Sequence, residues 1–522
     1  MRVLVLTAIA AAVLAVSVRW GSFVAGGPDS YCYVHQAQQW AAVLTGSGPL
    51  LAVEPLALEA PWPDAAATFV PVGHAPSPSV AGAIVPICPS GLSIAMAPFA
   101  AAGGPAAVFA VVPLFGVALI LATHAVGSRF GARVGLAAAL LTACSPVFLY
   151  QVVQPMSDVP AAALWMLAVA AATGTGRRHA LWSGLATSGA ILMRPNLVPL
   201  GFALGLYHLL RPERTWAQRL RAALVYAAAS APGCVAVAAL QATFFGSPLA
   251  SGYGSFDALF GAAHVWPNLQ RYAQWLADTH TPAIALVMLA PWLLPGTLAA
   301  LCLAMFAVNL ALYLPYLEFE HWSFLRFLLP TLPLVFVLVA AVVDAAIGRL
   351  ASGLSKDGSI APARDWGPAR SVAVAIAAIA LDLVYVRTAE EGQAFRLQRL
   401  EARFERAGVF VRDRLPPNAF LVTSWHSGSA RFYGGRKTLD WTSLDGAWLD
   451  RTIAFLENRG YEPYLMFERW EEPQFRRQFR GAAVADLDWP PAAEVAAQVR
   501  IYRPRDRERY LRGESPPTEY VR

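Results

Sequence analysis

Long apolar runs, separated by short polar or basic stretches, fill the chain as far as residue 386. A bilayer core about 30 Å thick needs about 20 apolar residues for each spanning helix, and shorter runs can serve where a helix is broken within protein. The pattern therefore predicts a multi-pass α-helical membrane protein with about eleven transmembrane segments. They are expected near residues 3–24, 106–126, 134–150, 159–173, 180–193, 196–210, 222–243, 282–294, 297–315, 327–347 and 371–386. We interpret the first as an anchor and not a cleaved signal peptide, because its apolar run continues past Arg19 to Ala25.

Basic residues fall on alternate connections between these segments. Short loops rich in Lys and Arg stay in the cytoplasm, so this pattern predicts a cytoplasmic N-terminus. The residues concerned are Arg129, Arg133, Arg177, Arg178, Arg211, Arg214, Arg219, Arg221, Arg349, Lys356, Arg364 and Arg370. Residues 26–80, in contrast, contain no Lys or Arg and belong to a first external loop at about 26–105. The chain from 387 onward is then expected outside the bacterial inner (plasma) membrane, in the periplasm or the extracellular space.

The pattern changes after residue 386. We predict a polytopic membrane domain over 1–386 and a small extracytoplasmic α/β domain over 387–522, because charged residues become frequent and helical and strand patterns alternate. Helices are expected at 389–413 and 445–460, and strands at 419–425, 461–468 and 499–504. No internal repeat is visible, which disfavours a transporter built from inverted halves.

Composition agrees with a protein that is largely dissolved in lipid. Hydrophobic residues make up 57% of the 522 residues and charged residues 14%, with a mean hydropathy of +0.46. The formal charge of +6 does not indicate nucleic-acid binding, because no block of Lys and Arg with interleaved aromatic residues is present. Five cysteines are too few for a disulfide scaffold. Cys32 and Cys88, in or beside the first external loop, could form a bridge, but the sequence favours two buried thiols.

Two aspartates are candidates for chemistry. Asp29 follows the first membrane segment by a few residues, at the depth where a lipid-linked phosphate would lie, and a carboxylate there could take the proton of an attacking acceptor. Its alternative role is that of a solvated loop residue or an N-cap for a helix starting near Tyr31. Asp158 lies at the external end of the fourth segment and could bind a sugar or a metal. Ser157 or Asp158 could equally cap that helix, with Pro160 in its first turn.

Two arginines in apolar surroundings are candidates for binding phosphate. Arg194 separates two short apolar segments, which are expected to be half-helices, and Arg326 lies at the external end of another segment. Charged groups at membrane depth mark functional sites by default, and a guanidinium binds phosphate through two parallel hydrogen bonds. Glu320 and His321, just before Arg326, are further candidate substrate-binding residues. The alternatives are that these arginines reach lipid headgroups, or that Arg326 pairs with Glu318 or Glu320.

Other kinds of site have no clear pattern in the chain. No His and carboxylate spacing is typical of a zinc site, and no Ser, His and Asp arrangement or glycine-rich phosphate loop stands out. A soluble nucleotide-sugar donor is therefore not indicated.

Four stretches carry a family resemblance. They are PDSYCYVHQ (28–36), PICPSGLSIAMAPF (86–99), SPVFLYQVVQPMSDVPAAALW (145–165), and RPN (194–196) followed by FLRFLLPTLP (324–333). With these stretches the chain resembles the polytopic GT-C class of glycosyltransferases and is similar to protein O-mannosyltransferases and to aminoarabinose or galacturonic acid transferases. The stretch LPPNAFLVTSWHSGSARFYGGR (415–436) also looks like part of the external domains appended to such enzymes.

The resemblance implies a function. It implies inverting transfer of a sugar from a polyprenyl-phosphate donor to a cell-envelope lipid, glycan or protein, with Asp29 at the catalytic position and Asp158 at a second acidic position. Many members carry paired acids at the first position, whereas Ser30 follows Asp29 here. A divalent metal such as Mg²⁺ or Mn²⁺, held by Asp29 and Asp158, is therefore left open. The alternative function is a non-catalytic lipid-linked glycan transporter or membrane scaffold, which would tolerate replacement of Asp29 by Asn.

Three residues of the C-terminal region are further candidates for this site. His426, Arg431 and Tyr433 could overhang the cleft of such an enzyme. The pattern favours instead their interpretation as ordinary surface residues.

Overall fold

The computed structural model describes residues 2–174, 176–353 and 367–521, which form two compact units. The first, here the helical unit, comprises residues 1–21, 109–239 and 254–397. The second, here the mixed unit, comprises residues 22–108, 240–253 and 398–522. This division differs from the predicted boundary at 386/387, because most of the first external loop joins the C-terminal region and not the membrane helices.

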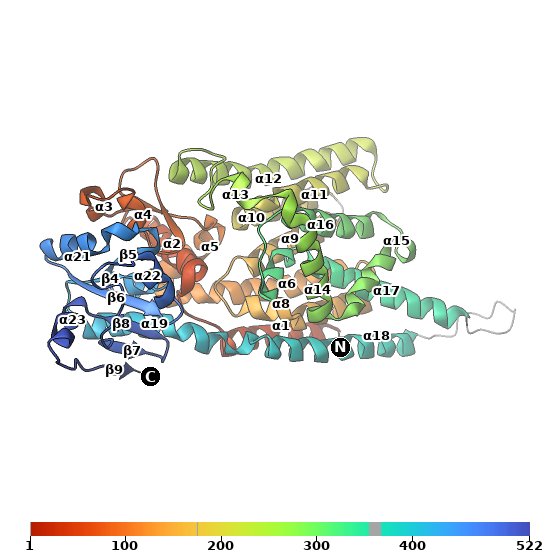
Figure 1. The fold of residues 1–522 in the computed structure, drawn as a ribbon. Coiled ribbons are helices and arrows are strands. Elements are labelled where there is room, and N and C mark those ends of the chain that lie inside the picture. The colour runs from red at the N-terminus through yellow and green to blue at the C-terminus, as the bar shows by residue number, and fades with distance from the viewer. Residues whose placement is uncertain (1, 175, 354–366, 522) are drawn as a thin grey trace. The chain divides into compact units, whose positions relative to one another are not determined.

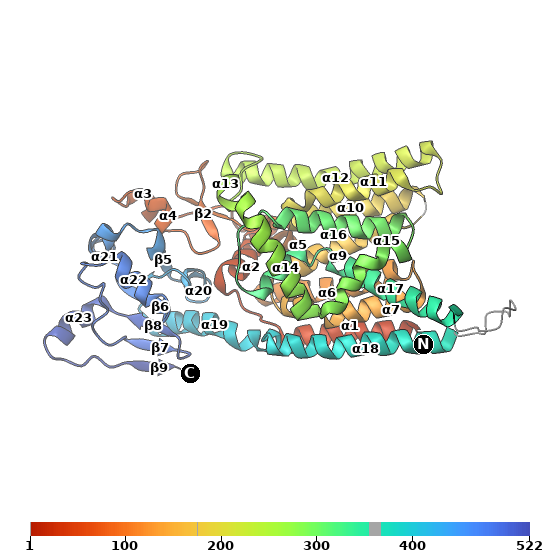
Figure 2. The same ribbon diagram turned by 45° about the vertical axis from the view of Figure 1, so that its right-hand side comes forward.

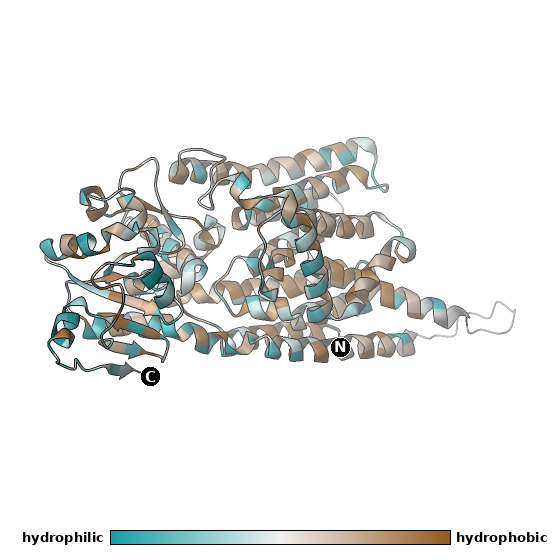
Figure 3. Ribbon diagram, viewed as in Figure 1, coloured by the Kyte–Doolittle hydropathy of each residue, from teal (hydrophilic) through white to brown (hydrophobic). Residues whose placement is uncertain are grey.

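Helices account for nearly all of the helical unit. Those that the structure describes are α1 (Arg2–Trp20), α6 (Val111–Gly127), α7 (Ala132–Cys144), α8 (Pro146–Val152), α9 (Asp158–Ala172), α10 (Arg177–Met193), α11 (Val198–Leu210), most of α12 (Trp216–Phe245), α13 (Phe256–Leu259), α14 (Val265–His280), α15 (Ala290–Leu293), α16 (Thr297–Tyr313), α17 (Leu332–Gly353) and α18 (Gly367–Glu391). In both ribbon views α1 and α18 run side by side along this unit (Figures 1 and 2). Apolar residues dominate these helices (Figure 3), and each predicted apolar segment coincides with a helix or a run of helical turns.

Fewer of these helices than predicted are long enough to cross a bilayer. Five are sufficiently long and apolar, and six if α7 and α8, which meet at an angle of 61°, count as one broken span. The bend follows from Pro146, which has no N–H group to continue the ladder of α7. Five further apolar helices are 10–17 residues long. The protein is thus a multi-pass integral membrane protein, and the figure of eleven spans stays a prediction.

The two ends of α9 lie in different electrostatic surroundings. Its first residue, Asp158, pairs with Arg194, the residue that follows α10. At its other end Arg211 donates to the carbonyl oxygens of Ala172 at 3.0 Å and Gly174 at 2.7 Å. A guanidinium on the last carbonyls of a helix is favoured by the helix dipole. Because α9 is roughly 22 Å long, these charged groups are separated by a distance close to the thickness of a bilayer core.

A mixed sheet forms the centre of the mixed unit. Its strand order is β5 (Lys437–Leu439), β4 (Ala419–Val422), β6 (Glu462–Glu468), β8 (Val499–Tyr502), β7 (Ala493–Val495) and β9 (Glu519–Val521). Strand β4 runs parallel to both β5 and β6, whereas β8 is antiparallel to its neighbours. Strands β4, β6 and β8 lie where the sequence predicts them. Alternating side chains of β4 point to opposite faces, so both faces of the sheet are buried.

Each face of this sheet has its own apolar core. One face packs against α19 (Leu397–Arg414) and α20 (Ser427–Phe432) and includes Leu421 and Val411. The other packs against α21 (Leu449–Asn458) and α22 (Glu472–Gln478) and includes Phe420. Leu56, Trp62 and Phe69 of the first external loop complete this second core, with Trp62 only 4% exposed. The loop is therefore part of the domain and not a connection on its surface.

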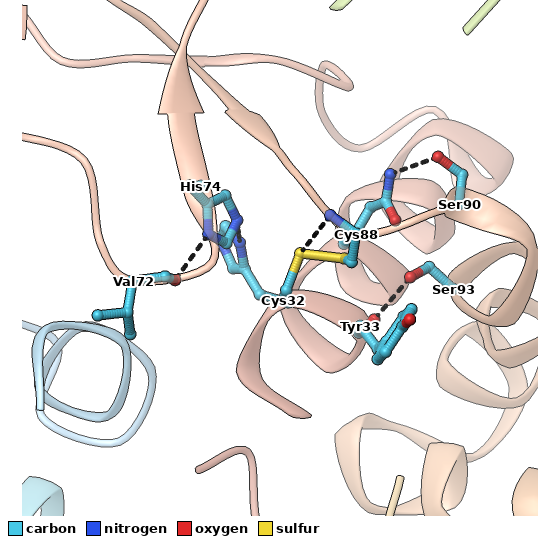
Figure 4. The surroundings of a disulfide bond; sticks show 9 residues. Cys32, Tyr33, Val72, His74, Cys88, Ser90 and Ser93 are labelled. Carbon is cyan, nitrogen blue, oxygen red and sulfur yellow. Dashed lines mark hydrogen bonds between the residues drawn. A yellow bond between two sulfur atoms is a disulfide. The ribbon is translucent and has the colours of Figure 1, made fainter. Parts of the chain in front are cut away.

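The rest of the external loop forms helices and a small sheet. They are α2 (Gly27–Thr45), α3 (Leu56–Glu59), α4 (Ala65–Thr68), α5 (Ser90–Gly103), and the antiparallel strands β1 (Ala52–Val53), β3 (Ala83–Pro86) and β2 (His74–Pro76). Cys32 and Cys88 are joined by a disulfide, with their Cα atoms 6.2 Å apart (Figure 4). The prediction of two free thiols was wrong, because the folded loop brings together two cysteines 56 residues apart in sequence.

Candidate functional site

A buried ion pair joins Asp158 and Arg194 in the helical unit. Arg194 Nη2 donates to Asp158 Oδ1 at 2.6 Å, and the two residues are 9% and 0% exposed. Oδ2 of Asp158 is also buried and has no hydrogen-bond partner among the residues that the structure describes. Ser157 is the N-cap residue of α9, but its side chain makes no cap hydrogen bond. The alternative of a simple capping role for Ser157 or Asp158 is therefore not what the structure shows.

Pro195 determines where Arg194 lies. The α-helical region is disfavoured for a residue before proline, and Arg194 has the extended angles φ −145° and ψ 90°. Helix α10 thus ends at Met193, and a 3₁₀ turn over Pro195–Leu197 leads into α11. The break turns the guanidinium towards the start of α9, which is packed beside α10.

Tyr313, at the C-terminal end of α16, contacts the residues at this break between α10 and α11. Its hydroxyl accepts hydrogen bonds from Arg194 Nη1 at 3.3 Å and from Asn196 Nδ2 at 2.7 Å. The main chain after it is fixed by Asn268 of α14, whose amide donates to the carbonyl oxygens of Leu314 at 3.0 Å and Tyr316 at 2.6 Å. Arg194 is consequently held by an anion on one nitrogen and a hydroxyl on the other. That arrangement fixes the plane of the guanidinium.

An aromatic ring connects Arg194 with Arg326. The rings of Tyr313 and Phe327 are stacked, with centroids 4.7 Å apart and planes 3° apart. The guanidinium carbons of Arg194 and Arg326 each lie 5.6 Å from the centre of the Phe327 ring, so they are at most twice that distance apart. Arg326 also lies 5.3 Å from the ring of Phe324. Both cations are thus stabilised by aromatic faces, and we call Asp158, Arg194, Tyr313, Arg326 and Phe327 the arginine–aromatic cluster.

The acidic residues before Arg326 lie at the surface of the helical unit. Glu318 pairs with Arg271 and His264, each at 3.2 Å. Glu320 is exposed. His321 is also exposed, and its Nδ1 accepts from the backbone N–H of Ser323, where it caps the 3₁₀ helix Trp322–Leu328. Of the predicted residues, Asp158, Arg194 and Arg326 are brought together, and Glu320 and His321 lie on the segment that leads to Arg326.

Asp29 lies in the mixed unit, in the first turn of α2. The helix begins at Gly27, earlier than the predicted start near Tyr31, and Asp29 is half-buried. The N-cap position is taken by Gly26, which has no side chain to cap the helix. A carboxylate in the first turn of a helix is favoured by the helix dipole.

Two histidines of the mixed unit form a buried pair beside Tyr31. His35 Nδ1 lies 3.2 Å from His74 Nε2, and both rings are close to the ring of Tyr31. Burial lowers the pKa of His35 to about 4 and holds the pKa of His74 well below its usual range, and the charge of Arg431 acts in the same direction. Both rings are therefore neutral at pH 7. His74 Nδ1 must donate to the carbonyl of Val72, so His74 Nε2 accepts from His35.

This pair makes the mixed unit sensitive to acid. Below pH 6.5 the unfolded chain binds protons on both histidines that the folded chain does not bind, so stability falls by about 1.4 kcal/mol per pH unit for each histidine. We expect the Tm of the wild type to fall more steeply from pH 7 to pH 5 than the Tm of His74→Gln. Other titrating groups are common to the two proteins, so equal slopes would contradict the assignment.

The sequence interpretation of His426, Arg431 and Tyr433 as surface residues was wrong. His426 is 0% exposed, and its Nε2 lies 3.0 Å from Glu468 Oε1. Arg431 donates to the carbonyl oxygen of Phe69 at 2.6 Å, and the hydroxyl of Tyr433 accepts from the N–H of Ala25 at 2.8 Å. The latter two residues attach the first external loop to the C-terminal region.

Sequence reasoning missed Tyr313, Asn196 and Phe327. Asn196 is part of the RPN stretch, where a polar residue in an apolar run was the available signal. Tyr313 and Phe327 lie in apolar runs in which aromatic residues are common, and only their contacts distinguish them.

The comparisons with known proteins agree with one another. A family model for dolichyl-phosphate-mannose-protein mannosyltransferases matches residues 92–239. The fold is similar to that of ArnT from Cupriavidus metallidurans bound to undecaprenyl phosphate, with a TM-score of 0.55 and 13% identity over 91% of this chain and 94% of ArnT. It is also similar to the oligosaccharyltransferase AglB from Archaeoglobus fulgidus, in complex with an inhibitory peptide and a dolichol-phosphate, with a TM-score of 0.55 and 12% identity over 93% of this chain and 72% of AglB. No curated protein matches the sequence.

Residues 92–239 thus match a mannosyltransferase family model, and the whole chain has a fold similar to those of ArnT and of an oligosaccharyltransferase. The matched residues include Asp158 and Arg194, so the match at the level of sequence covers this ion pair. Asp29 and Arg326 lie outside that region.

A divalent metal held by Asp29 and Asp158 is one possibility that the sequence leaves open. Across the described ranges, no group of three or more His, Cys, Asp and Glu side chains is placed to hold an ion. Asp158 Oδ1 is already engaged by Arg194. The described side chains therefore do not form a metal centre.

Proposed function

We propose that the chain is a glycosyltransferase that moves a sugar from a polyprenyl-phosphate donor to an acceptor of the cell envelope, with inversion at the anomeric carbon. The observation that carries the proposal is the arginine–aromatic cluster, in which two guanidinium groups flank one ring at the end of apolar helices. A lipid-linked phosphate is an anion fixed at the membrane surface by its apolar tail. The cluster offers what such a ligand needs, namely cations next to an apolar surface.

The solved structures with a similar fold support the choice of donor. ArnT is bound to undecaprenyl phosphate and AglB is in complex with a dolichol-phosphate, and both ligands are phosphates of polyprenyl-type lipids. We extend this ligand class to the present chain and assign the phosphate to Arg194 and Arg326. Asp158, with one oxygen on Arg194 and a second buried oxygen, would orient that guanidinium or accept a sugar hydroxyl.

The chemistry that we assign requires one base and one stabilised leaving group. The acceptor oxygen attacks the anomeric carbon from the face opposite the phosphate, while the bond between that carbon and the phosphate oxygen breaks. Asp29 takes the proton of the acceptor. The donor phosphodiester, with one negative charge, leaves as a phosphomonoester with two, and the arginines stabilise the charge that develops. The products are the glycosylated acceptor and the polyprenyl phosphate.

We assign this reaction to the external face of the bacterial inner membrane. Support comes from the basic connections, of which Arg211 and Arg214 bind carbonyl oxygens at the end of α9 remote from Asp158. With the N-terminus cytoplasmic, that end faces the cytoplasm, and the arginine–aromatic cluster, Asp29 and the residues after 387 face outward.

Mass spectrometry of the cell envelope tests the proposal and identifies the sugar. Lipids, glycans and glycoproteins would be compared between cells that lack the gene and cells complemented with the wild type or Asp29→Asn. We expect one hexose or pentose modification to be absent from the deletion strain and from the Asp29→Asn strain, and restored by the wild type. If the Asp29→Asn protein restores the modification fully, the catalytic role of Asp29 is wrong, and a role as a carrier or scaffold is favoured.

A further inference from the structure

We infer that Tyr433 and Gly428, both in the C-terminal region, are positioning residues for Asp29. The inference rests on the proposed role of Asp29 as the base. It concerns the mixed unit alone, in which α2 and the C-terminal region are packed together. The sequence gives no hint of it, because the residues that touch are about 400 positions apart.

The start of α2 has no side-chain cap. Gly26 at the N-cap makes no side-chain hydrogen bond, and Gly27 has φ +58°, a conformation that other residues rarely adopt. Asp29 follows Gly27 by two residues. The position of this turn therefore depends on contacts with other parts of the mixed unit.

Residues of the C-terminal region contact the chain on both sides of Asp29. The hydroxyl of Tyr433 accepts from the N–H of Ala25 at 2.8 Å, just before the glycine pair. Gly26 lies so close to Phe404 of α19 that a Cβ atom there would be 2.5 Å from the ring. A Cβ atom on Gly428 would likewise lie 2.5 Å from the ring of Tyr31, so α20 packs directly under the first turn of α2. Asp29 is thus bracketed by contacts at residues 25, 26 and 31.

The opposite side of α2 is fixed independently. The disulfide joins Cys32 to Cys88, the amide of Gln36 donates to Ser90 at 2.8 Å, and the hydroxyl of Ser93 donates to the carbonyl of Tyr33 at 2.9 Å (Figure 4). Helix α2 therefore remains packed on α5 when a contact to the C-terminal region is lost. Such a loss would change the position of the first turn, where Gly73 is a further close contact, since a Cβ atom there would lie 2.3 Å from the carbonyl oxygen of Pro28.

A small displacement of the base has a large kinetic effect. A shift of about 1 Å in a reacting group can cost about a hundredfold in rate. Tyr433→Phe removes only the hydroxyl that accepts the hydrogen bond from Ala25. Gly428→Ala places a methyl group against the ring of Tyr31. Both should lower kcat for sugar transfer, while the KM for the lipid donor, which we assign to the arginine–aromatic cluster, stays unchanged.

The test measures kcat and KM of the full-length enzyme per folded molecule, with the polyprenyl-phosphate sugar identified by the envelope analysis as donor. We expect Tyr433→Phe to lower kcat about tenfold and leave KM within twofold of the wild type. Tyr464→Phe is the matched control, since it removes a hydroxyl that donates to Glu462 at 2.9 Å in the same unit but away from α2. It should keep the wild-type kcat.

Three outcomes separate the possibilities. If Tyr433→Phe and Gly428→Ala both keep a kcat within twofold of the wild type, the positioning role is wrong. If their Tm falls while kcat per folded molecule is unchanged, these residues are merely structural and the inference is again overturned. If Asp29→Asn in the same series transfers sugar at the wild-type rate, the proposed base is wrong, whatever the two positioning variants do.

Discussion

Replacement of Asp29 by Asn is expected to lower the rate of sugar transfer by about two to four orders of magnitude, the usual contribution of a general base. Asn keeps the size of the side chain and its place in the first turn of α2, but it cannot take the proton of the acceptor. Binding of the lipid phosphate, assigned to Arg194 and Arg326, should not change. The measurement is transfer of a radiolabelled sugar from polyprenyl phosphate by the purified enzyme, with lipid binding measured in parallel.

A matched control is available in the same loop. Asp64 is exposed and lies in the left-handed region, with φ 52°, a conformation that Asn also tolerates. Asp64→Asn therefore makes the same chemical change without a role in transfer, and it should retain the wild-type rate. Loss of activity in both variants, or in neither, would contradict a specific role for Asp29.

Replacement of Arg194 by Lys is expected to weaken binding of polyprenyl phosphate by about tenfold or more, which corresponds to at least about 1.4 kcal/mol. Lys keeps the positive charge but not the planar fork. It cannot at once pair with Asp158 Oδ1, donate to the hydroxyl of Tyr313 and present a flat face to Phe327. The measurement is the Kd of polyprenyl phosphate for the enzyme in nanodiscs.

Two comparisons separate binding from folding in this experiment. Arg219→Lys is the control, because Arg219 donates to backbone carbonyls in the basic loop before α12 and should not affect the lipid. Removal of the charge by Arg194→Ala would leave Asp158 buried without its partner and cost several kcal/mol of stability. It is therefore a poorer test. A Kd for Arg194→Lys equal to that of the wild type would contradict the assignment of the phosphate.

The membrane helices could be located from the sequence because burial in lipid demands long apolar runs. Even the break at Arg194 could be located, since Pro195 forces it. Span lengths were harder to predict. Pro146 divides one apolar run into α7 and α8, and several other runs form helices too short to cross a bilayer by themselves.

The sequence does not reveal which segments make up the mixed unit, because they are joined by contacts between distant parts of the chain. In the sequence Trp62 and Phe69 are typical of a loop at a membrane surface, whereas in the structure they share a core with Phe420. The disulfide between Cys32 and Cys88 could not be predicted for the same reason. Strands β4, β6 and β8 were predictable because their apolar residues are adjacent in sequence.

The arginine–aromatic cluster was predicted only in part. Arg194 and Arg326 stood out as charges in apolar surroundings, and Asp158 as a carboxylate at a helix start. Their link through Phe327, and the hydroxyl of Tyr313 on Arg194, could not be read from sequence, since neither aromatic residue differs locally from its neighbours.

Photocrosslinking with a polyprenyl phosphate that carries a diazirine next to its phosphate tests the central claim most directly. The enzyme would be labelled in nanodiscs, and the modified peptides identified by mass spectrometry. The account predicts label in residues 194–197 and 322–328 that is displaced by unmodified polyprenyl phosphate and reduced in Arg194→Lys. Label confined to lipid-facing helices such as α12, and unaffected by the competitor, would contradict it.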